Sequence, residues 1–380
     1  MKRTGHLFDQ LTSWPNLCRA AHKARRGKRF RPNVQWFEFH REWQLLQLQR
    51  ELTSGSYTPS GYRTFVIYEP KRRLISAAPY RDRVVHHAVC NVLEPLFERG
   101  FISDSYACRP AKGNHAAVYR ASEFAQRYRY VLKADIRKFF PSVDHQVLLA
   151  VVARRIKDPR VMDLLGKIIA NTGPQDRPTL LFPGDDLFTP LERPIGLPLG
   201  NQTSQFLANV LLDPLDHFIK ERLRIQGYLR YADDLLLFAD DKRLLADARK
   251  RVRRFLAELR LRLHPQKCEI SPTTQAVSFL GFRVFPTHRL LDKRNVLRFR
   301  RRLRRMQRDY QDRRIKATQI RQRLVSWFGH ARHGNSDRLI RRLLRQHPFL
   351  RHALQRATRA TPRATAKPSA SCANLSPSPD

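Results

Sequence analysis

The sequence predicts an α+β fold, with helices and short strands in most of the chain and helices alone towards its carboxy-terminal end. Apolar residues recur at helical spacing in several long segments. Short runs rich in aromatic and β-branched residues, such as "YRYVLKADIRKFF", are typical of strands instead. With 380 residues, 42% of them hydrophobic, the chain is long enough for two or three compact units with a sizeable core.

The first half of the chain alternates between these two patterns. Residues 1–60 are predicted to be helical, with a Gly-Ser stop at the end of "LQRELTSGSY". Residues 62–78 alternate apolar and polar side chains, which predicts two strands joined by a basic turn. Residues 82–101 return to helical periodicity.

The second half continues in the same way. A strand is expected within residues 128–140 and a helix over 143–172, followed by an irregular stretch to about Pro198. Residues 204–223 form an amphipathic helical pattern, and residues 228–239 predict a hairpin whose turn lies near two adjacent acids.

The carboxy-terminal part is strongly basic. Residues 292–360 contain 22 Lys or Arg against 4 Asp or Glu. A stripe of apolar residues at spacings of three and four predicts a helix whose other faces are cationic: Val296, Phe299, Leu303, Met306 and Tyr310. A phosphate backbone alongside would relieve the mutual repulsion, and a solvated helix face is the alternative. Residues 351–380, rich in Pro, Ser and Ala, are expected to be a disordered tail.

The overall charge indicates a polyanionic partner. The chain has 73 Lys and Arg against 33 Asp and Glu, a net charge of +40. Because the basic residues are spread along the chain, nucleic acid fits better than a membrane patch. A ribosome-associated or non-specific RNA binder fits the charge equally well.

Cysteine usage and hydropathy favour a cytoplasmic protein with no membrane partner. The five cysteines form no CxxC pair: Cys18, Cys90, Cys108, Cys268 and Cys372. This spacing suggests neither a zinc site nor a disulfide framework. The amino terminus has no apolar core of signal-peptide length, and no apolar run approaches the roughly 20 residues that span a bilayer.

Three acids stand out as candidate metal ligands. Asp233 and Asp234 interrupt the apolar segment "GYLRYADDLLLFADD", where carboxylates are costly unless they are solvated, paired or bound to metal. Asp135 follows another apolar strand. Carboxylates from different segments can hold two Mg²⁺ ions about 4 Å apart for phosphoryl transfer. Taken alone, an Asp-Asp dipeptide is more often a turn or a helix cap.

Five motifs in order give these acids a context. They are "SDSYACRPAKGNHAA", "KADIRKFFPSVDH", "YADD", "LRLHPQKCEI" and "FLGFRVF". Together they resemble the fingers and palm motifs of reverse transcriptases of the group II intron-like lineage, over most of residues 15–335. The resemblance implies a right-hand polymerase with fingers, palm and thumb and a Tyr-x-Asp-Asp hairpin in the palm.

That resemblance also implies a domain order along the chain. A helical extension (1–60) precedes the fingers and palm (61–291), with fingers at 61–130 and in an insertion near 146–190, and a basic helical thumb (292–350) follows.

The same resemblance assigns roles to individual residues. Asp135, Asp233 and Asp234 become the ligands of two Mg²⁺ ions, for which Mn²⁺ is a substitute, whereas Asp240 and Asp241 lie outside the motif, at the solvated end of the strand. The remaining assignments are the triphosphate clamp Arg73 with Lys71 or Arg72, a sugar gate at Phe140, and Lys267 beside the active site. The charge density of the carboxy-terminal helix separately selects the backbone-binding arginines Arg300, Arg301, Arg304, Arg305 and Arg308. Strand alternation alone would place Phe139, not Phe140, on the face of Asp135. A solvated basic turn stays open for the clamp, and a surface lysine for Lys267.

One departure from the family pattern suggests a subgroup. In "GLPLGNQTSQFLAN", Leu199 before Gly200 replaces the usual Gln, and Gln205 replaces the Pro after Ser204. This pattern is similar to reverse transcriptases of diversity-generating retroelements, and the similarity implies error-prone copying at template adenines. Leu offers no hydrogen bond to the nascent base pair, so discrimination between nucleotides should weaken.

The expected function is therefore synthesis of complementary DNA from an RNA template. The expected partners are template RNA, primer or cDNA, deoxynucleoside triphosphates and a small basic accessory protein. The expected location is the cytoplasm, with a bacterial, archaeal or phage-encoded origin. Two alternatives are open: a stand-alone group II-like or phage-defence reverse transcriptase, and a non-catalytic RNA-binding scaffold with a polymerase fold.

Overall fold

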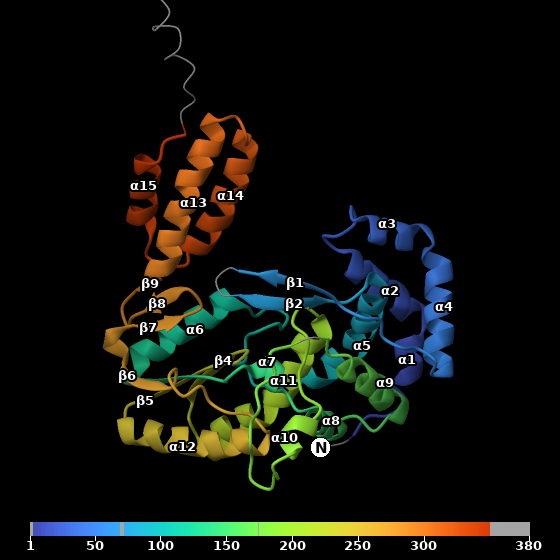
Figure 1. Cartoon of the computed structure of the whole chain (residues 1–380). Helices are drawn as coiled ribbons and strands as arrows, with labels where there is room; N and C mark the ends of the chain where they lie inside the picture. Colours follow the sequence, from blue (N-terminus) through green and yellow to red (C-terminus); the bar gives the residue numbers. More distant parts are fainter. Residues whose placement is uncertain (1–2, 69–71, 174, 350–380) are drawn as a thin grey trace, which may run out of the picture. The chain divides into compact units, whose positions relative to one another are not determined.

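The structure is a computed structural model that describes residues 3–68, 72–173 and 175–349 (Figure 1). The chain divides after Asp292 into two compact units. The first unit contains helices and all the strands described, and the described part of the second is helical. Among the described residues, no helix combines the length and the apolar character that crossing a membrane requires.

The first unit begins with four helices, three of which pack against a fifth. They are α1 (Phe8–Thr12), α2 (Trp14–Arg25), α3 (Pro32–Phe39), α4 (Arg41–Ser54) and α5 (Tyr80–Glu98). All of α1 to α3 contact α5, and α4 packs on α1, α2 and α3. Helix α4 ends at Gly55, which has a φ of 76° and supplies the left-handed cap that the Gly-Ser stop predicted.

Two antiparallel sheets position the site. Strands β1 (Arg63–Ile67) and β2 (Arg73–Ala77) form the expected hairpin. A second sheet has the order β4-β5-β3-β6, where β4 is Gly227–Tyr231, β5 Asp234–Ala239, β3 Tyr130–Asp135 and β6 Glu269–Pro272. The register of β3 and β5 places Asp135 opposite Asp234.

The four-stranded sheet is covered on both faces. Four consecutive residues of β5, Leu235 to Phe238, are buried, and successive strand residues point to opposite faces. Helices α6 (Asn114–Arg127) and α12 (Lys242–Glu258) pack against the sheet from opposite sides (Figure 1). The acids at the tip of the β4–β5 hairpin therefore stand at the edge of a rigid, fully packed layer.

Between β3 and β4 the structure corrects one prediction. Residues 143–172 form two helices, α8 (His145–Ala153) and α9 (Pro159–Ala170), because Asp158 caps a new helix that begins with Pro159. The short helices α7 (Phe139–Ser142) and α10 (Thr189–Glu192) flank this pair. The predicted helix over 204–223 begins earlier, as α11 (Gln202–His217), and ends in a π-helical turn at Phe218–Arg222.

A small third sheet precedes the second unit. It consists of β7 (Val277–Phe279), β8 (Phe282–Val284) and β9 (Arg289–Leu291), which the sequence analysis did not identify as strands.

The second unit contains α13 (Lys293–Gln311), α14 (Ala317–Ala331) and α15 (Asp337–Gln346). Phe299, Leu303 and Met306 of the predicted apolar stripe are buried, and the Phe299 ring stacks on Trp327 with centroids 3.6 Å apart. The remaining two residues of the stripe are half-buried, so the predicted helix and its apolar face are confirmed.

We predict that Gly227→Ala destabilises the first unit. A Cβ at Gly227 would lie 2.7 Å from the carbonyl oxygen of Phe238, the strand partner of Gly227. Overpacking of this kind costs about 1–3 kcal/mol in free energy of unfolding, which denaturant unfolding measures. Gly166→Ala in α9 is the matched control, because a Cβ there meets nothing within 4 Å and alanine favours a helix. Equal stability losses in the two variants would contradict the argument.

Candidate active site

The hairpin turn brings the three predicted acids together. Strands β4 and β5 are joined by two residues, Ala232 and Asp233, because Tyr231 pairs with Asp234. Asp135 ends β3 directly opposite Asp234, and the amide of Ile136 donates to the carbonyl oxygen of Asp233 at 3.2 Å. The antiparallel pairing alone therefore gathers three carboxylates at one end of the sheet.

The electrostatics of this cluster are unfavourable without a cation. The pKa of Asp233 is raised to about 6, first by burial and then by the charges of Asp234 and Asp135, while Arg73 opposes the shift. A raised pKa means that the folded state prefers the protonated acid. The cluster therefore loses stability as pH rises through about 6, unless a bound cation compensates the charge.

The donor set fits a divalent metal ion. Three carboxylates supply the hard oxygen ligands that Mg²⁺ prefers. In this structure Asp135 is held by Lys267, whose Nζ lies 2.5 Å from Oδ2 of the acid. Among the described residues, no three Asp, Glu, His or Cys side chains are already arranged as a metal site.

A cavity of about 380 Å³ opens beside the acids. Asp233 lines it from the β4–β5 hairpin, Arg72 and Arg73 from the β1–β2 hairpin, Phe140 from α7 and Leu199 from the loop before α11. Five residues predicted from four separate segments thus share one cavity. Asp135, Asp234, Gly200 and Lys267 do not line it, and Lys71 lies outside the described residues.

The two phenylalanines after Asp135 differ in burial. Strand β3 ends at Asp135, and Lys138 adopts a left-handed conformation with a φ of 44° before α7 begins. Strand alternation therefore does not extend to these residues. Phe139 is 2% exposed and belongs to the core, whereas Phe140 is half-buried; both line the cavity.

The Leu199–Gly200 loop is fixed by its backbone. The carbonyl oxygen of Leu199 accepts a 2.9 Å hydrogen bond from the amide of Ser76 in β2. Gly200 has a φ of 116°, and a Cβ there would lie 3.0 Å from the Ile75 side chain and 3.4 Å from the Ser76 carbonyl oxygen. Only glycine suits this conformation and this close approach.

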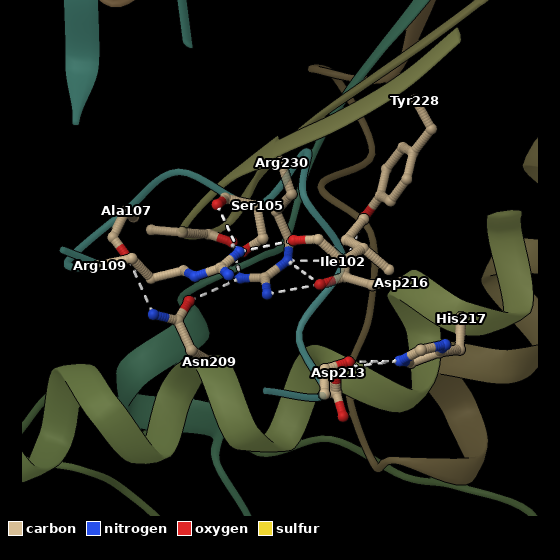
Figure 2. Close-up of polar contacts among 12 residues, drawn as sticks. Ile102, Ser105, Ala107, Arg109, Asn209, Asp213, Asp216, His217, Tyr228 and Arg230 are labelled. Atoms are coloured by element: carbon tan, nitrogen blue, oxygen red, sulfur yellow. Dashed lines mark hydrogen bonds and ion pairs between the residues drawn. The ribbon is translucent and has the colours of Figure 1, made fainter. Parts of the chain in front are cut away.

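The hairpin tip is supported from behind by an ion pair that the sequence analysis missed (Figure 2). Arg230 and Asp216 are both fully buried, and the guanidinium makes bidentate contact with the carboxylate, the shortest at 2.6 Å. Nη1 of Arg230 also donates to Asn209 at 3.0 Å and to the carbonyl oxygen of Ala232 at 3.2 Å. Tyr228 donates to Asp216 at 2.6 Å.

This contact matters because the turn is strained. Ala232 has a φ of 54°, a conformation that costs a residue with a side chain about 1–2 kcal/mol. Arg230 binds the carbonyl group of the peptide that leads into Asp233, and it is itself anchored on α11 through Asp216 and Asn209. Arg230 is therefore a positioning residue for the turn.

The second acid pair has structural roles. Asp240 accepts a hydrogen bond from the amide of Arg129 at 3.0 Å, and Asp241 caps α12 by accepting from Arg243 at 2.7 Å. Both are exposed, as expected, but they anchor neighbouring backbone rather than only ending a strand.

The predicted backbone-binding arginines all lie on α13. Arg300 is half-buried and the others are exposed: Arg301, Arg304, Arg305 and Arg308. Arg305 forms an ion pair with Asp309 at 3.8 Å, so part of its charge is compensated within the helix.

Comparison with known proteins gives this arrangement a family. The family described as reverse transcriptase (RNA-dependent DNA polymerase) matches residues 68–284. Protein YkfC of Escherichia coli (strain K12) is 30% identical over 294 residues, which cover 66% of this chain and 72% of YkfC. The group II intron-encoded protein LtrA of Lactococcus lactis subsp. cremoris is 25% identical over 47% of this chain and 28% of LtrA.

Solved structures of telomerase also align with this chain. The telomerase of Candida albicans, in complex with a fragment of telomeric RNA, has a TM-score of 0.44 at 12% identity and covers 62% of this chain and 46% of its own. The apo telomerase of Candida tropicalis has a TM-score of 0.46 at 12% identity and covers 67% and 60%.

The chain belongs to the reverse transcriptase family. It has the right-hand fold of that family, and its enzyme class is RNA-directed DNA polymerase. Proteins of this type bind template RNA and nucleotides and generally use divalent metal ions. The chain spans most of YkfC but less than a third of LtrA.

We predict that Arg230→Lys impairs catalysis beyond its effect on folding. Lysine keeps the charge but cannot bind Asp216, Asn209 and the Ala232 carbonyl group at once, so the turn loses its support. The kcat for primer extension should fall by about 10-fold or more, the scale of one charge-assisted hydrogen bond, with little change in nucleic-acid affinity. Arg155→Lys is the matched control, since Arg155 pairs with buried Asp213 at 3.3 Å and does not contact the turn. Equal losses of melting temperature with unchanged kcat in both variants would show that Arg230 is only structural.

Proposed function

We propose that this reverse transcriptase synthesises DNA on an RNA template by two-metal phosphoryl transfer, and that the copying is error-prone, as in diversity-generating retroelements. The observation behind the catalytic part is the convergence of Asp233, Arg72, Arg73, Phe140 and Leu199 on one cavity beside the acids. If these residues were ordinary solvated surface residues, we would not expect residues from four separate segments to line one cavity.

The site residues named above have proposed tasks. Asp135, Asp233 and Asp234, of which Asp233 lines the cavity, would hold two Mg²⁺ ions, and these ions would lower the pKa of the primer 3′-hydroxyl and neutralise the triphosphate. Arg73, with Arg72 or Lys71, binds the phosphates of the incoming nucleotide. Phe140 occupies the space that a ribose 2′-hydroxyl would need.

Residues around the cavity complete the proposal. Lys267 keeps the charge of Asp135 compensated, and Gly200 allows close backbone approach beside the nascent base pair. The arginines of α13 bind the phosphate backbone of the template–primer duplex. Their exposure and the scarcity of acids on this helix support that role.

The error-prone character rests on Leu199. Its side chain lines the cavity that Phe140 and Asp233 also line, so it faces the space proposed for the nascent base pair. Leu can pack against the base pair, but it cannot form a hydrogen bond whose strength depends on the geometry of the pair. A mispair and a correct pair therefore receive nearly the same stabilisation from this position.

The wider setting is part of the same proposal. Template RNA, primer, deoxynucleoside triphosphates and a small basic accessory protein are the proposed partners, and the cytoplasm is the proposed location. The four described cysteines are all free, which suits a reducing compartment. The similarity to LtrA supports the alternative of a group II-like enzyme without a diversifying role. Near-identical repeats that flank the gene and differ at adenines would favour diversification.

The catalytic assignment predicts that Asp233→Asn with Asp234→Asn abolishes extension. Asparagine keeps the size but removes the charge that holds the metal ions, so Mg²⁺-dependent extension should fall by more than about 100-fold, while RNA binding survives. Primer extension and gel-shift assays measure the two properties. Asp240→Asn with Asp241→Asn is the matched control and should keep most of the activity. Near-normal extension by the Asp233/Asp234 variant would exclude the assignment.

The fidelity assignment predicts that Leu199→Gln lowers misincorporation, chiefly opposite template adenine. Gln adds a hydrogen bond that only a correct pair makes well, worth about 0.5–1.5 kcal/mol, or a few-fold in error rate. Sequencing of extension products gives the error spectrum. Leu191→Gln, at a position that is 73% exposed and outside the cavity, should leave the spectrum unchanged. An unchanged spectrum with less product from Leu199→Gln would mean that Leu199 only packs the fold.

A further inference from the structure

One buried side chain, His145 at the start of α8, holds a peptide group in the segment that leads to Leu199. The residue is 7% exposed, and Nε2 of its ring lies 2.9 Å from the carbonyl oxygen of Gly196. Because a carbonyl oxygen can only accept, Nε2 carries a proton and donates it. Burial is the first cause that lowers the pKa of His145, so the ring is uncharged at neutral pH and has its single proton on Nε2.

The peptide group between Gly196 and Leu197 also holds the backbone of the predicted sugar gate. Its N–H belongs to Leu197 and donates to the carbonyl oxygen of Phe140 at 2.8 Å. The oxygen and the N–H of a trans peptide lie on opposite sides of one plane, so His145 fixes the direction in which this N–H points. Helix α7, which contains Phe140, has only four residues, so contacts from outside the helix help to hold Phe140 in place.

The local sequence allows this peptide group to rotate unless a side chain restrains it. Gly196 has a φ of 108°, and glycine exchanges such conformations for others at little steric cost. The amide of Gly196 donates to the carbonyl oxygen of Val143 at 2.8 Å, and the Leu197 side chain is 1% exposed. Both ends of the peptide group are therefore anchored, and its plane can turn between them when the contact with His145 is lost.

The start of the segment is fixed more firmly, by buried charges. Asp144, which is fully buried, forms ion pairs with Arg260 at 2.7 Å and with Arg193 at 3.4 Å. Arg193 begins the segment, and Asp144 directly precedes His145. Loss of the His145 ring would therefore act on one peptide group rather than displace the whole segment.

We propose that His145 is a positioning residue that sets the places of both Phe140 and Leu199 in the cavity of about 380 Å³ beside the acids. This inference rests on the proposed function, in which Phe140 selects the sugar and Leu199 contacts the base pair. Leu199 follows Leu197 by two residues, and the ring of Pro198 between them fixes its own φ. A rotation at Leu197 is therefore passed on to Leu199 as well as to Phe140.

Two substitutions at position 145 of the full-length protein test this role. His145→Leu removes the hydrogen bond, whereas His145→Gln keeps it, because the glutamine amide nitrogen reaches about as far from the main chain as Nε2 does. In His145→Leu, ribonucleotide incorporation and base misincorporation should both rise by a few-fold, the scale of one neutral hydrogen bond. His145→Gln should return both errors to the level of the unaltered protein. Kinetics with single deoxy- and ribonucleotides measures the first error, and sequencing of extension products measures the second.

His217→Leu is the matched control. Nε2 of His217 lies 2.9 Å from the carbonyl oxygen of Gly100, so this variant loses a contact of the same kind and length, and neither residue lines the cavity. The melting temperature of this variant should fall while both errors stay unchanged. The same outcome in His145→Leu would show that His145 is only structural and would overturn the proposal. A rise in one error alone, or equal errors in His145→Leu and His145→Gln, would overturn it as well.

Further measurements separate this inference from the proposed function. If His145→Leu does not fold, His145→Asn replaces it, because asparagine keeps an amide but is too short to reach Gly196. Phe140→Ala should raise ribonucleotide incorporation without the change in base errors, and an unchanged sugar preference would contradict the gate itself. Normal DNA synthesis by the unaltered protein, with unchanged errors in the His145 variants, removes only the role of His145. Absence of DNA synthesis by the unaltered protein contradicts the proposed function.

Discussion

The buried ion pair of Arg230 and Asp216 is the interaction on which the candidate active site depends. Burying two charges is expensive, and such a pair persists only when the remaining hydrogen-bonding groups are also satisfied. Here Tyr228 and Asn209 complete the network (Figure 2) together with the carbonyl group of Ala232. The pair joins the hairpin to α11. The packed core therefore resists the displacement of the hairpin tip that repulsion among the acids would otherwise cause.

Two cavities of the first unit differ in the charged residues that line them. The cavity beside the acids combines carboxylates with arginines, which suits a nucleotide that arrives with metal ions. A cavity of about 480 Å³ on the other side of the Leu199–Asn201 loop has two cations, Lys28 and Arg83, and one carboxylate, Glu94, in its wall. A loop of three residues, Leu199 to Asn201, borders both cavities, so a change in this loop would alter the walls of both.

Local patterns were sufficient to predict the β1–β2 hairpin, the acid-tipped hairpin and the apolar stripe of α13, because each follows from spacing within a few residues. The break before α9 was missed, although Asp158 followed by Pro159 is a helix-start signal. The role of Arg230 depends on residues that lie 14 and 21 positions away. Asn209 and Asp216, seven residues apart on one face of the apolar α11, were the available signal. The choice of Phe140 over Phe139 came from family resemblance alone. Strand alternation carried past Asp135 would have selected Phe139, but the strand ends at Asp135, so alternation could not decide between them.

The hydrogen bond between the Ser76 amide and the Leu199 carbonyl group has an evolutionary consequence. It holds the loop through the main chain, so the shape of the loop does not depend on which side chain stands at position 199. Gly200, in contrast, is confined by its conformation and by the contact with β2. Substitutions at Leu199 can therefore accumulate without loss of the fold. Under the role proposed for Leu199, the accuracy of the enzyme could then be selected in a single mutational step while the loop keeps its main-chain anchor.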